Sequence, residues 1–180
     1  MTLSYVALLR GINVGGKNVV PMAELRELFA SLGHSSVSTF IQSGNVLFSS
    51  NAPVSPETLQ AAITKRFKLD VTVVLREPAE LRHVVASNPF AAGDPTKVHV
   101  GFMTSNPSTN SLHLLEKAAF EPEEFTILGK EVYLYLPDGM ARTKLPSYLY
   151  RHLQLPITFR NWRTVTKLME LAAELAGLDL

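Results

Sequence analysis

The chain has 180 residues, of which 46% are hydrophobic and 18% are charged, and its formal net charge is +1. These values exclude an intrinsically disordered protein and a strongly basic protein that binds nucleic acid through its overall charge. The absence of cysteine excludes a disulfide framework, a catalytic thiol and cysteine-bound zinc or iron–sulfur sites. A chain of this length is expected to form one domain or two small, closely packed lobes.

The first half of the chain predicts a β-α-β-β-α-β order of elements. Apolar periodicity, prolines at helix starts and glycine breaks define these elements. In chain order they are a strand at 4–10, a helix at 21–32, strands at 37–42 and 45–49, a helix at 56–68 and a strand at 71–75. Ser43 and Gly44 separate the two middle strands, which indicates a hairpin. This order is that of the ferredoxin-like split unit.

The second half predicts the same order again. Its elements are a strand at 97–103, a helix at 110–119, a hairpin of strands at 125–128 and 131–136 around Gly129 and Lys130, a helix at 145–153 and a strand at 156–159. A helix at 79–87 and the stretch "NPFAAGDPT" link the two halves. A final helix at 162–176, capped by Asn161, carries an apolar stripe of Trp162, Val165, Met169, Ala172 and Ala176.

These elements predict an α+β protein of two ferredoxin-like repeats, and therefore an internal duplication. The expected organisation is an N-terminal lobe at 1–76, a linking helix and linker at 77–96, a C-terminal lobe at 97–160 and a C-terminal helix at 161–180 that packs on the lobes. The run "YVALL" indicates a first strand buried on both faces. Such a strand leaves no open sheet face for nucleic-acid bases, and the motif of RNA-binding sheets is absent.

The stretch "LLRGINVGGKNVVPMAEL" leads from the first strand through three glycines into the first helix. It contains G-x-x-x-x-G-K, but a phosphate-binding P-loop needs a hydroxyl after the lysine and a helix that starts there. Here Asn18 follows Lys17 and two valines precede Pro21, so the P-loop interpretation fails. A weaker interpretation is an anion-binding nest of glycine amides, with charge from Arg10 and Lys17. The alternative is a connector whose glycines only accommodate positive φ.

The glycine loop and the turn at 42–45 are expected at one edge of the sheet. A right-handed crossover sends the first two strands in the same direction, and the third strand returns beside the first. Arg10 and Lys17 would then neutralise a ligand's charge, while nearby amide side chains orient it. The candidate ligand-binding residues are Arg10, Gly11, Asn13, Gly15, Gly16, Lys17, Gln42, Ser43 and Asn45.

Residues 139–169 contain six basic residues and no aspartate or glutamate. This segment predicts a second candidate anion patch at Arg142, Lys144, Arg160, Arg163 and Lys167. The alternative is a solvated helix face that complements acidic residues elsewhere. Trp162 is expected to anchor the last helix in the core, and a stacking platform for a base is the minor alternative.

The stretches "LLRGINVGGKN", "PMAELR", "TFIQSGNVLF", "YLPDG", "RTKL" and "TFRNWRTVTKL" occur in this order over nearly the whole chain. In these stretches the sequence resembles the bacterial domain of unknown function 1697 family. The resemblance implies an α+β protein of two related lobes and implies no activity. Val19 stands where many members are expected to carry a lysine, which makes the loop less cationic here.

The leading hypothesis from these residues is a cytoplasmic protein that binds a small anionic ligand, such as a nucleotide or phosphorylated metabolite, at the glycine-loop edge. One alternative, which is not favoured, is a nucleic-acid-binding module that uses the cationic segment. Another is a scaffold or homodimerising protein without a ligand. No residue presents itself as a catalytic base or nucleophile, so the sequence leaves open whether the protein is an enzyme, as it does the oligomeric state.

No cofactor, metal or membrane is expected as a partner. The five histidines lack the spacing of metal ligands. The apolar run at 3–9 has no basic leader and is too short to span a bilayer, so neither a signal peptide nor a membrane span is predicted. These features favour the cytoplasm.

Overall fold

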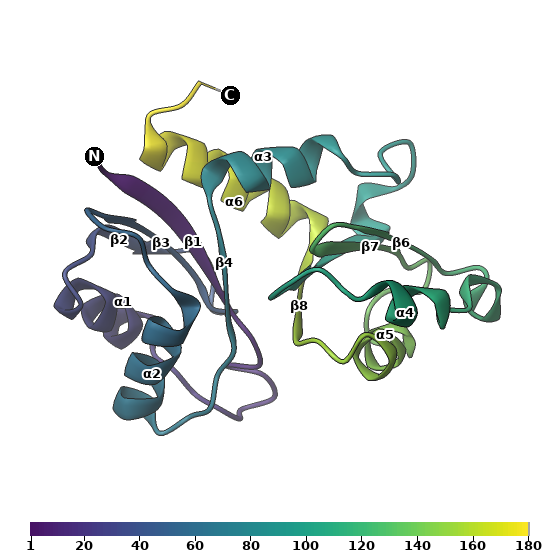
Figure 1. Ribbon diagram of the computed structural model, residues 1–180, viewed down its shortest axis with the longest axis horizontal. Coiled ribbons are helices and arrows are strands. Elements are labelled where there is room, and N and C mark those ends of the chain that lie inside the picture. The colour runs from purple at the N-terminus through teal and green to yellow at the C-terminus, as the bar shows by residue number, and fades with distance from the viewer. Residues whose placement is uncertain (180) are drawn as a thin grey trace. The chain divides into compact units, whose positions relative to one another are not determined.

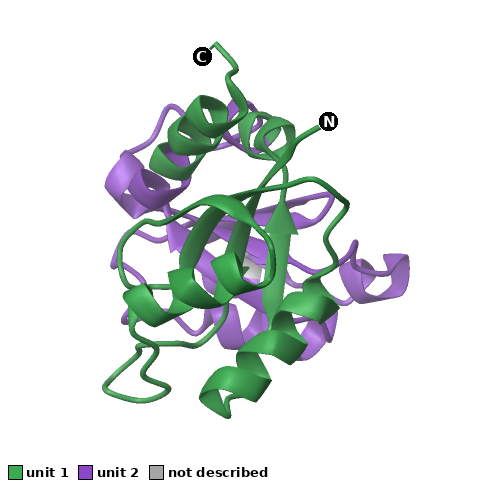
Figure 2. Ribbon diagram, turned by 90° about the vertical axis from the view of Figure 1, so that its left-hand side faces the viewer, with its two compact units in different colours: residues 1–83, 167–180 green, residues 84–166 purple. Residues whose placement is uncertain are grey.

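The computed structural model describes residues 1–179. In these residues the chain forms two four-stranded antiparallel sheets and six α-helices, which confirms the predicted α+β class (Figure 1). The chain divides into two compact units: unit 1 consists of Met1–His83 and Lys167–Leu180, and unit 2 consists of Val84–Thr166 (Figure 2). None of the described helices combines the length and apolar character needed to cross a membrane.

Unit 1 contains one sheet with the strand order β2-β3-β1-β4. Its elements are β1 (Leu3–Leu9), α1 (Met22–Ser31), β2 (Ser35–Thr39), β3 (Asn45–Ser50), α2 (Pro56–Phe67) and β4 (Val73–Arg76). Helices α1 and α2 lie on the same face of this sheet (Figure 1). Phe29 of α1, Phe48 of β3 and Ile63 of α2 are fully buried in the core between them. Two further helices, α3 (Pro78–Ala86) and α6 (Trp162–Ala176), contribute residues to both units.

The central strand β1 is buried on both faces, as the run "YVALL" predicts. Tyr5, Ala7 and Leu9 belong to the core that includes α1 and α2. Val6 and Leu8 point to the opposite face, because side chains alternate along a strand, and both are fully buried. The strand pairs with β3 from Leu3 to Leu8 and with β4 from Val6 to Leu9. The glycine loop therefore begins at the end of a strand that is paired on both sides and buried on both faces.

Unit 2 contains a second sheet with the strand order β6-β7-β5-β8. Its elements are η1 (Pro95–Lys97), β5 (Val98–Met103), α4 (Thr109–His113), η2 (Lys117–Phe120), β6 (Glu124–Leu128), β7 (Glu131–Tyr135), α5 (Leu145–Leu153) and β8 (Ile157–Asn161). Leu145, Leu149 and Leu153 of α5 recur once per turn and pack into the core of this unit. The predicted hairpin around Gly129 and Lys130 is confirmed by the pairing of Leu128 with Glu131.

A helix of the second half and a hairpin of the first half differ from their predictions. The helix predicted at 110–119 ends at His113, because the Glu116 amide donates to the Tyr148 Oη at 2.8 Å and does not continue the helical ladder. The strands predicted at 37–42 and 45–49 are joined by a loop wider than the expected two-residue turn. β2 ends at Thr39, and the Phe40 amide donates to the Asn45 carbonyl oxygen across this loop.

The last helix, α6, has the predicted bounds, and Val165 and Ala172 of its predicted apolar stripe are buried, whereas the rest of the stripe is not. Its buried residues are Thr164, Val165, Leu168, Ala172 and Ala173. Trp162 and Met169 are only half-buried, and Ala176 is exposed. The prediction placed the stripe by counting from Trp162, whereas the buried face is centred on Val165, Leu168 and Ala172. Trp162 is therefore left at the margin of the core, where part of its surface faces solvent.

Candidate functional site

The glycine loop ends in a tight hairpin turn. Val14 and Lys17 pair as an antiparallel bridge, and the Lys17 amide donates to the Val14 carbonyl oxygen at 3.0 Å. The two central residues have positive φ, 56° at Gly15 and 73° at Gly16, as a type I′ turn requires. A side chain at such a position costs about 1–2 kcal/mol, which explains the paired glycines. Since the Lys17 amide bonds within the turn, only the side chain of Lys17 is offered to a ligand.

Asn13 fastens the glycine loop to the loop between β2 and β3. Its Nδ2 donates to the Val20 carbonyl oxygen at 3.0 Å and to the Gln42 carbonyl oxygen at 2.8 Å. Its Oδ1 accepts from the Val20 amide at 2.8 Å. Both donor hydrogens of this amide are thereby used within the protein. Asn13 therefore positions the site, and its predicted role in orienting a ligand would have to rest on the remaining lone pair of Oδ1.

Asn45 holds the second loop from inside. The side chain is fully buried, and its Nδ2 donates to the Phe40 carbonyl oxygen at 3.0 Å and to Ser43 Oγ at 2.9 Å. The neighbouring Gly44 accepts from the Leu9 amide at 2.8 Å through its carbonyl oxygen. These bonds join the loop to the end of β1. Asn45 thus lies beneath the candidate site and does not line its surface.

A side chain at position 44 would collide with the glycine loop. Gly44 has φ +84°, and a Cβ added there would lie 2.8 Å from both Leu9 Cβ and Ile12 Cδ1. Leu9 and Ile12 are themselves fully buried or nearly so. The side chains of Leu9 and Ile12 therefore pack directly against the backbone of Gly44, closer than a residue with a Cβ permits.

The side chains left at the surface of this edge are cationic and polar. Arg10, Lys17 and Gln42 are exposed, as are Gly11, Gly15 and Gly16, whereas Ser43 is half-buried. The Arg10 amide donates to the Thr72 carbonyl oxygen at 2.9 Å, which fixes the backbone where the loop begins. Residues 8–20 and 40–45 contain two cations and no carboxylate. This edge thus carries exposed positive charge on a backbone that several hydrogen bonds hold in place.

The second candidate patch is not a set of equivalent surface cations. Arg160 is buried on β8, and its Nη1 donates to Thr158 Oγ1 and to the Phe159 carbonyl oxygen, both at 2.9 Å. Burial lowers the pKa of Arg160 to about 10. Lys167 pairs with Glu170 at 3.1 Å. Arg142, Lys144 and Arg163 are exposed. Charge counting along the sequence could not separate these residues, because burial of β8 decides the environment of Arg160.

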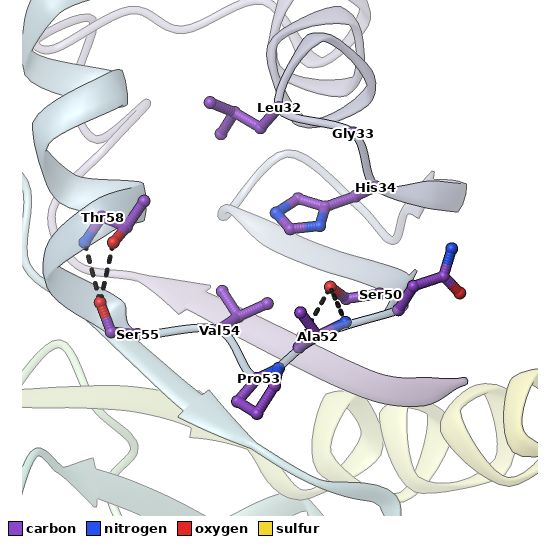
Figure 3. Close-up of a pocket in the computed structure, with 10 residues that line it drawn as sticks. Leu32, Gly33, His34, Ser50, Ala52, Pro53, Val54, Ser55 and Thr58 are labelled. Carbon is purple, nitrogen blue, oxygen red and sulfur yellow. Dashed lines mark hydrogen bonds between the residues drawn. The ribbon is translucent and has the colours of Figure 1, made fainter. Parts of the chain in front are cut away.

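Unit 1 also holds a cavity that the sequence did not indicate. Its volume is about 310 Å³, and His34, Ser50, Ser55 and Thr58 contribute polar groups to its lining (Figure 3). The Ser50 hydroxyl bonds to Ala52, and Ser55 Oγ bonds to both the amide and the hydroxyl of Thr58.

His34 is the titratable residue of this lining. Its Nδ1 is buried and has no hydrogen-bond partner among residues 1–179. Burial lowers the pKa of His34, and its ring packs 4.6 Å from the ring of Phe48. A neutral imidazole and hydroxyls that bond to neighbouring residues favour a structural role for this cavity.

The comparisons with known proteins agree with the resemblance found in the sequence. Residues 1–133 match the model of a family described as "Protein of unknown function (DUF1697)". The chain is also similar to a solved structure described as a conserved bacterial protein from Streptococcus pneumoniae, with 26% sequence identity and a TM-score of 0.72. That similarity covers 96% of this chain and 99% of that chain. No curated protein matches the sequence.

Proposed function

Because the chain belongs to the DUF1697 family, whose description gives no activity, we propose a function from the chain's own residues. The protein binds a small anionic ligand, such as a nucleotide or another phosphorylated metabolite, at the edge of unit 1 formed by residues 10–17 and 42–45. Arg10 and Lys17 neutralise the charge of the ligand. Gln42 donates or accepts hydrogen bonds, and the glycines keep the loop surface free of side chains.

One observation carries this proposal: Asn13 Nδ2 donates to the Gln42 carbonyl oxygen at 2.8 Å and joins the two loops before any ligand arrives. A binding edge that is already ordered loses less conformational entropy when a ligand binds. Left-handed backbone at the non-glycine residues Asn13 and Asn18 adds to the argument, because such residues gather at functional sites where the surrounding structure supports them.

A thermal-shift screen tests the proposal. Wild-type protein is heated in turn with four anions that lack an aromatic ring, namely inorganic phosphate, pyrophosphate, a sugar phosphate and citrate. A ligand at about one hundred times its dissociation constant adds about 2.7 kcal/mol to the free energy of unfolding, which raises the melting temperature visibly. The double variant Arg10→Gln/Lys17→Gln is expected to lose the shift. The matched control Lys65→Gln, an exposed lysine of α2, is expected to keep it.

A shift that survives in the double variant contradicts the assignment of the ligand to this edge. No shift with any of the four compounds favours a scaffold or homodimer instead, and light scattering of the purified protein then measures its oligomeric state.

We also infer that both units are copies of one ferredoxin-like β-α-β-β-α-β unit. Support comes from the strand order, which is the same in both sheets when each is numbered from its own first strand. Superposition of the two sheets in an experimental structure checks this inference. Residence in the cytoplasm is proposed from the sequence features alone, and cell fractionation checks it.

A further inference from the structure

Unit 2 contains a larger cavity, of about 560 Å³, that lies apart from the glycine loop in the chain. Its lining includes Thr96 of η1, His99 of β5, and Asn161, Trp162, Arg163 and Thr166 at the junction of β8 and α6. Pockets for small organic ligands have volumes of about 300–1,000 Å³. This cavity is therefore large enough for a whole mononucleotide-sized molecule and is not limited to a single ion.

The fold brings these side chains together by strand pairing. His99 and Asn161 are direct partners in the register of β5 and β8, so their side chains lie next to each other on the same face of the sheet. Asn161 Oδ1 accepts from the Thr164 amide at 2.8 Å, which caps α6. The cap fixes where the helix starts and so places Trp162 and Arg163 in its first turn.

The chemistry of the lining is that of a hydrogen-bond donor surface. Within residues 1–179, the guanidinium of Arg163 and the indole N–H of Trp162 have no hydrogen-bond or ion-pair partner. Burial lowers the pKa of His99, so the imidazole is neutral near pH 7. Asp94 precedes the lining residue Thr96 by two positions, and its carboxylate accepts from the amide and the hydroxyl of Thr96.

The lining therefore combines an aromatic ring system, a planar cation and amide and imidazole groups, with no carboxylate among the residues that form it. A planar ring stacks favourably on indole, and base stacking on an aromatic side chain contributes about 1–3 kcal/mol. A guanidinium binds phosphate or carboxylate through two parallel hydrogen bonds. Both preferences are met by one molecule only if it carries a ring and an anionic group.

We propose that this cavity binds a ligand with a planar heteroaromatic ring and an anionic group, as in a nucleoside monophosphate. The ring stacks on Trp162, the anionic group binds Arg163, and Asn161 and His99 form hydrogen bonds to the polar edge of the ligand. This site is separate from the one proposed at residues 10–17 and 42–45, and it does not depend on that proposal.

The chain contains a single tryptophan, so its fluorescence reports directly on this cavity. Purified full-length protein is titrated with adenosine monophosphate and guanosine monophosphate, with excitation at the red edge of tryptophan absorption. Saturable quenching is expected with at least one of them. Adenosine, which lacks the anion, is expected to bind at least tenfold more weakly, and inorganic phosphate, which lacks the ring, is expected to leave the fluorescence unchanged.

Arg163→Gln is expected to lower the affinity for the nucleoside monophosphate at least tenfold. Arg151 is an exposed arginine of α5, and Arg151→Gln is expected to keep the wild-type affinity. Both positions are exposed, and urea unfolding verifies that both variants remain folded. The Arg10→Gln/Lys17→Gln variant is expected to keep the quenching, which separates this site from the glycine-loop edge.

Three results overturn the proposal. The first is the absence of saturable quenching with either monophosphate. The second is quenching that Arg163→Gln leaves unchanged. The third is quenching only by a short oligonucleotide with a steep salt dependence, because this would assign the surface to a nucleic-acid strand and not to a small molecule.

Discussion

The contact between Gly44 and the glycine loop predicts that one methyl group added at position 44 lowers the free energy of unfolding substantially. In Gly44→Ala the new Cβ would lie 2.8 Å from Leu9 Cβ and Ile12 Cδ1, and the residue would keep φ near +84°. Left-handed backbone at alanine costs about 1–2 kcal/mol, and overpacking of a closed core costs about 1–3 kcal/mol more. The expected loss is therefore about 2–5 kcal/mol of the free energy of unfolding, a large share of the 5–15 kcal/mol typical of a domain.

Gly16→Ala is the matched control for this variant. Gly16 also has positive φ, 73°, but an added Cβ there meets no atom within 4 Å. Its expected loss is the backbone cost alone, about 1–2 kcal/mol. Urea unfolding measures both variants, with the slope of the transition as a check that the unfolded state is unchanged.

A third variant tests the collision itself. Gly44→Ala/Ile12→Val removes the Cδ1 atom and is expected to recover part of the loss, although the contact with Leu9 Cβ remains. Equal losses for Gly44→Ala and Gly16→Ala would refute the reasoning, because the close approach of the two loops would then have no energetic consequence.

Three further predictions concern single side chains. Asn13→Gly keeps the left-handed backbone and removes three hydrogen bonds, so a loss of about 1.5–4.5 kcal/mol is expected at about 0.5–1.5 kcal/mol each. Faster hydrogen exchange of the Val20 amide would accompany this loss, and unchanged exchange would contradict it. Ser55→Ala removes the side-chain cap on the Thr58 amide and is expected to cost about 1 kcal/mol in urea unfolding, while Ser55→Asp keeps the stability. The pKa of His34 is lowered in the folded protein, so the unfolded chain binds the proton first and stability falls as the pH drops through about 6.5. His34→Gln is expected to reduce this fall without abolishing it, since the pKa of His99 is also lowered; an unaltered pH profile in urea unfolding would contradict the assignment.

The sequence predicted well those elements whose ends are set by residues nearby in the sequence. The bounds of α5 and α6 follow from apolar spacing and from local caps such as Asn161. The early end of α4 depends on Tyr148, which lies 32 residues from its partner Glu116. The width of the loop between β2 and β3 likewise depends on bonds made by the buried Asn45. Propensity carries no information about such distant partners.

The same limit applies to the candidate sites. Glycines and cations of the loop could be read from the sequence, but the bond between Asn13 and Gln42 spans 29 residues and appears only in the folded chain. The cavity beside Trp162 requires the pairing of His99 with Asn161, which no local pattern encodes. Sequence reasoning therefore named the residues of the loops, but it assigned Asn13 and Asn45 to a ligand and not to the bonds that fix the loops. It did not indicate the cavity in unit 2.

The residues of the glycine-loop edge fall into two groups with different experimental behaviour. Asn13, Asn45 and Gly44 hold the loops through buried or bonded groups, so substitutions there change stability and, through the displaced loops, any binding. Arg10 and Lys17 have exposed side chains, and surface substitutions of this kind usually change stability by less than about 0.5 kcal/mol. A loss of binding without a loss of stability in the charge variants would therefore identify direct contact with a ligand. A parallel loss of both would mean that these cations act on the loop itself.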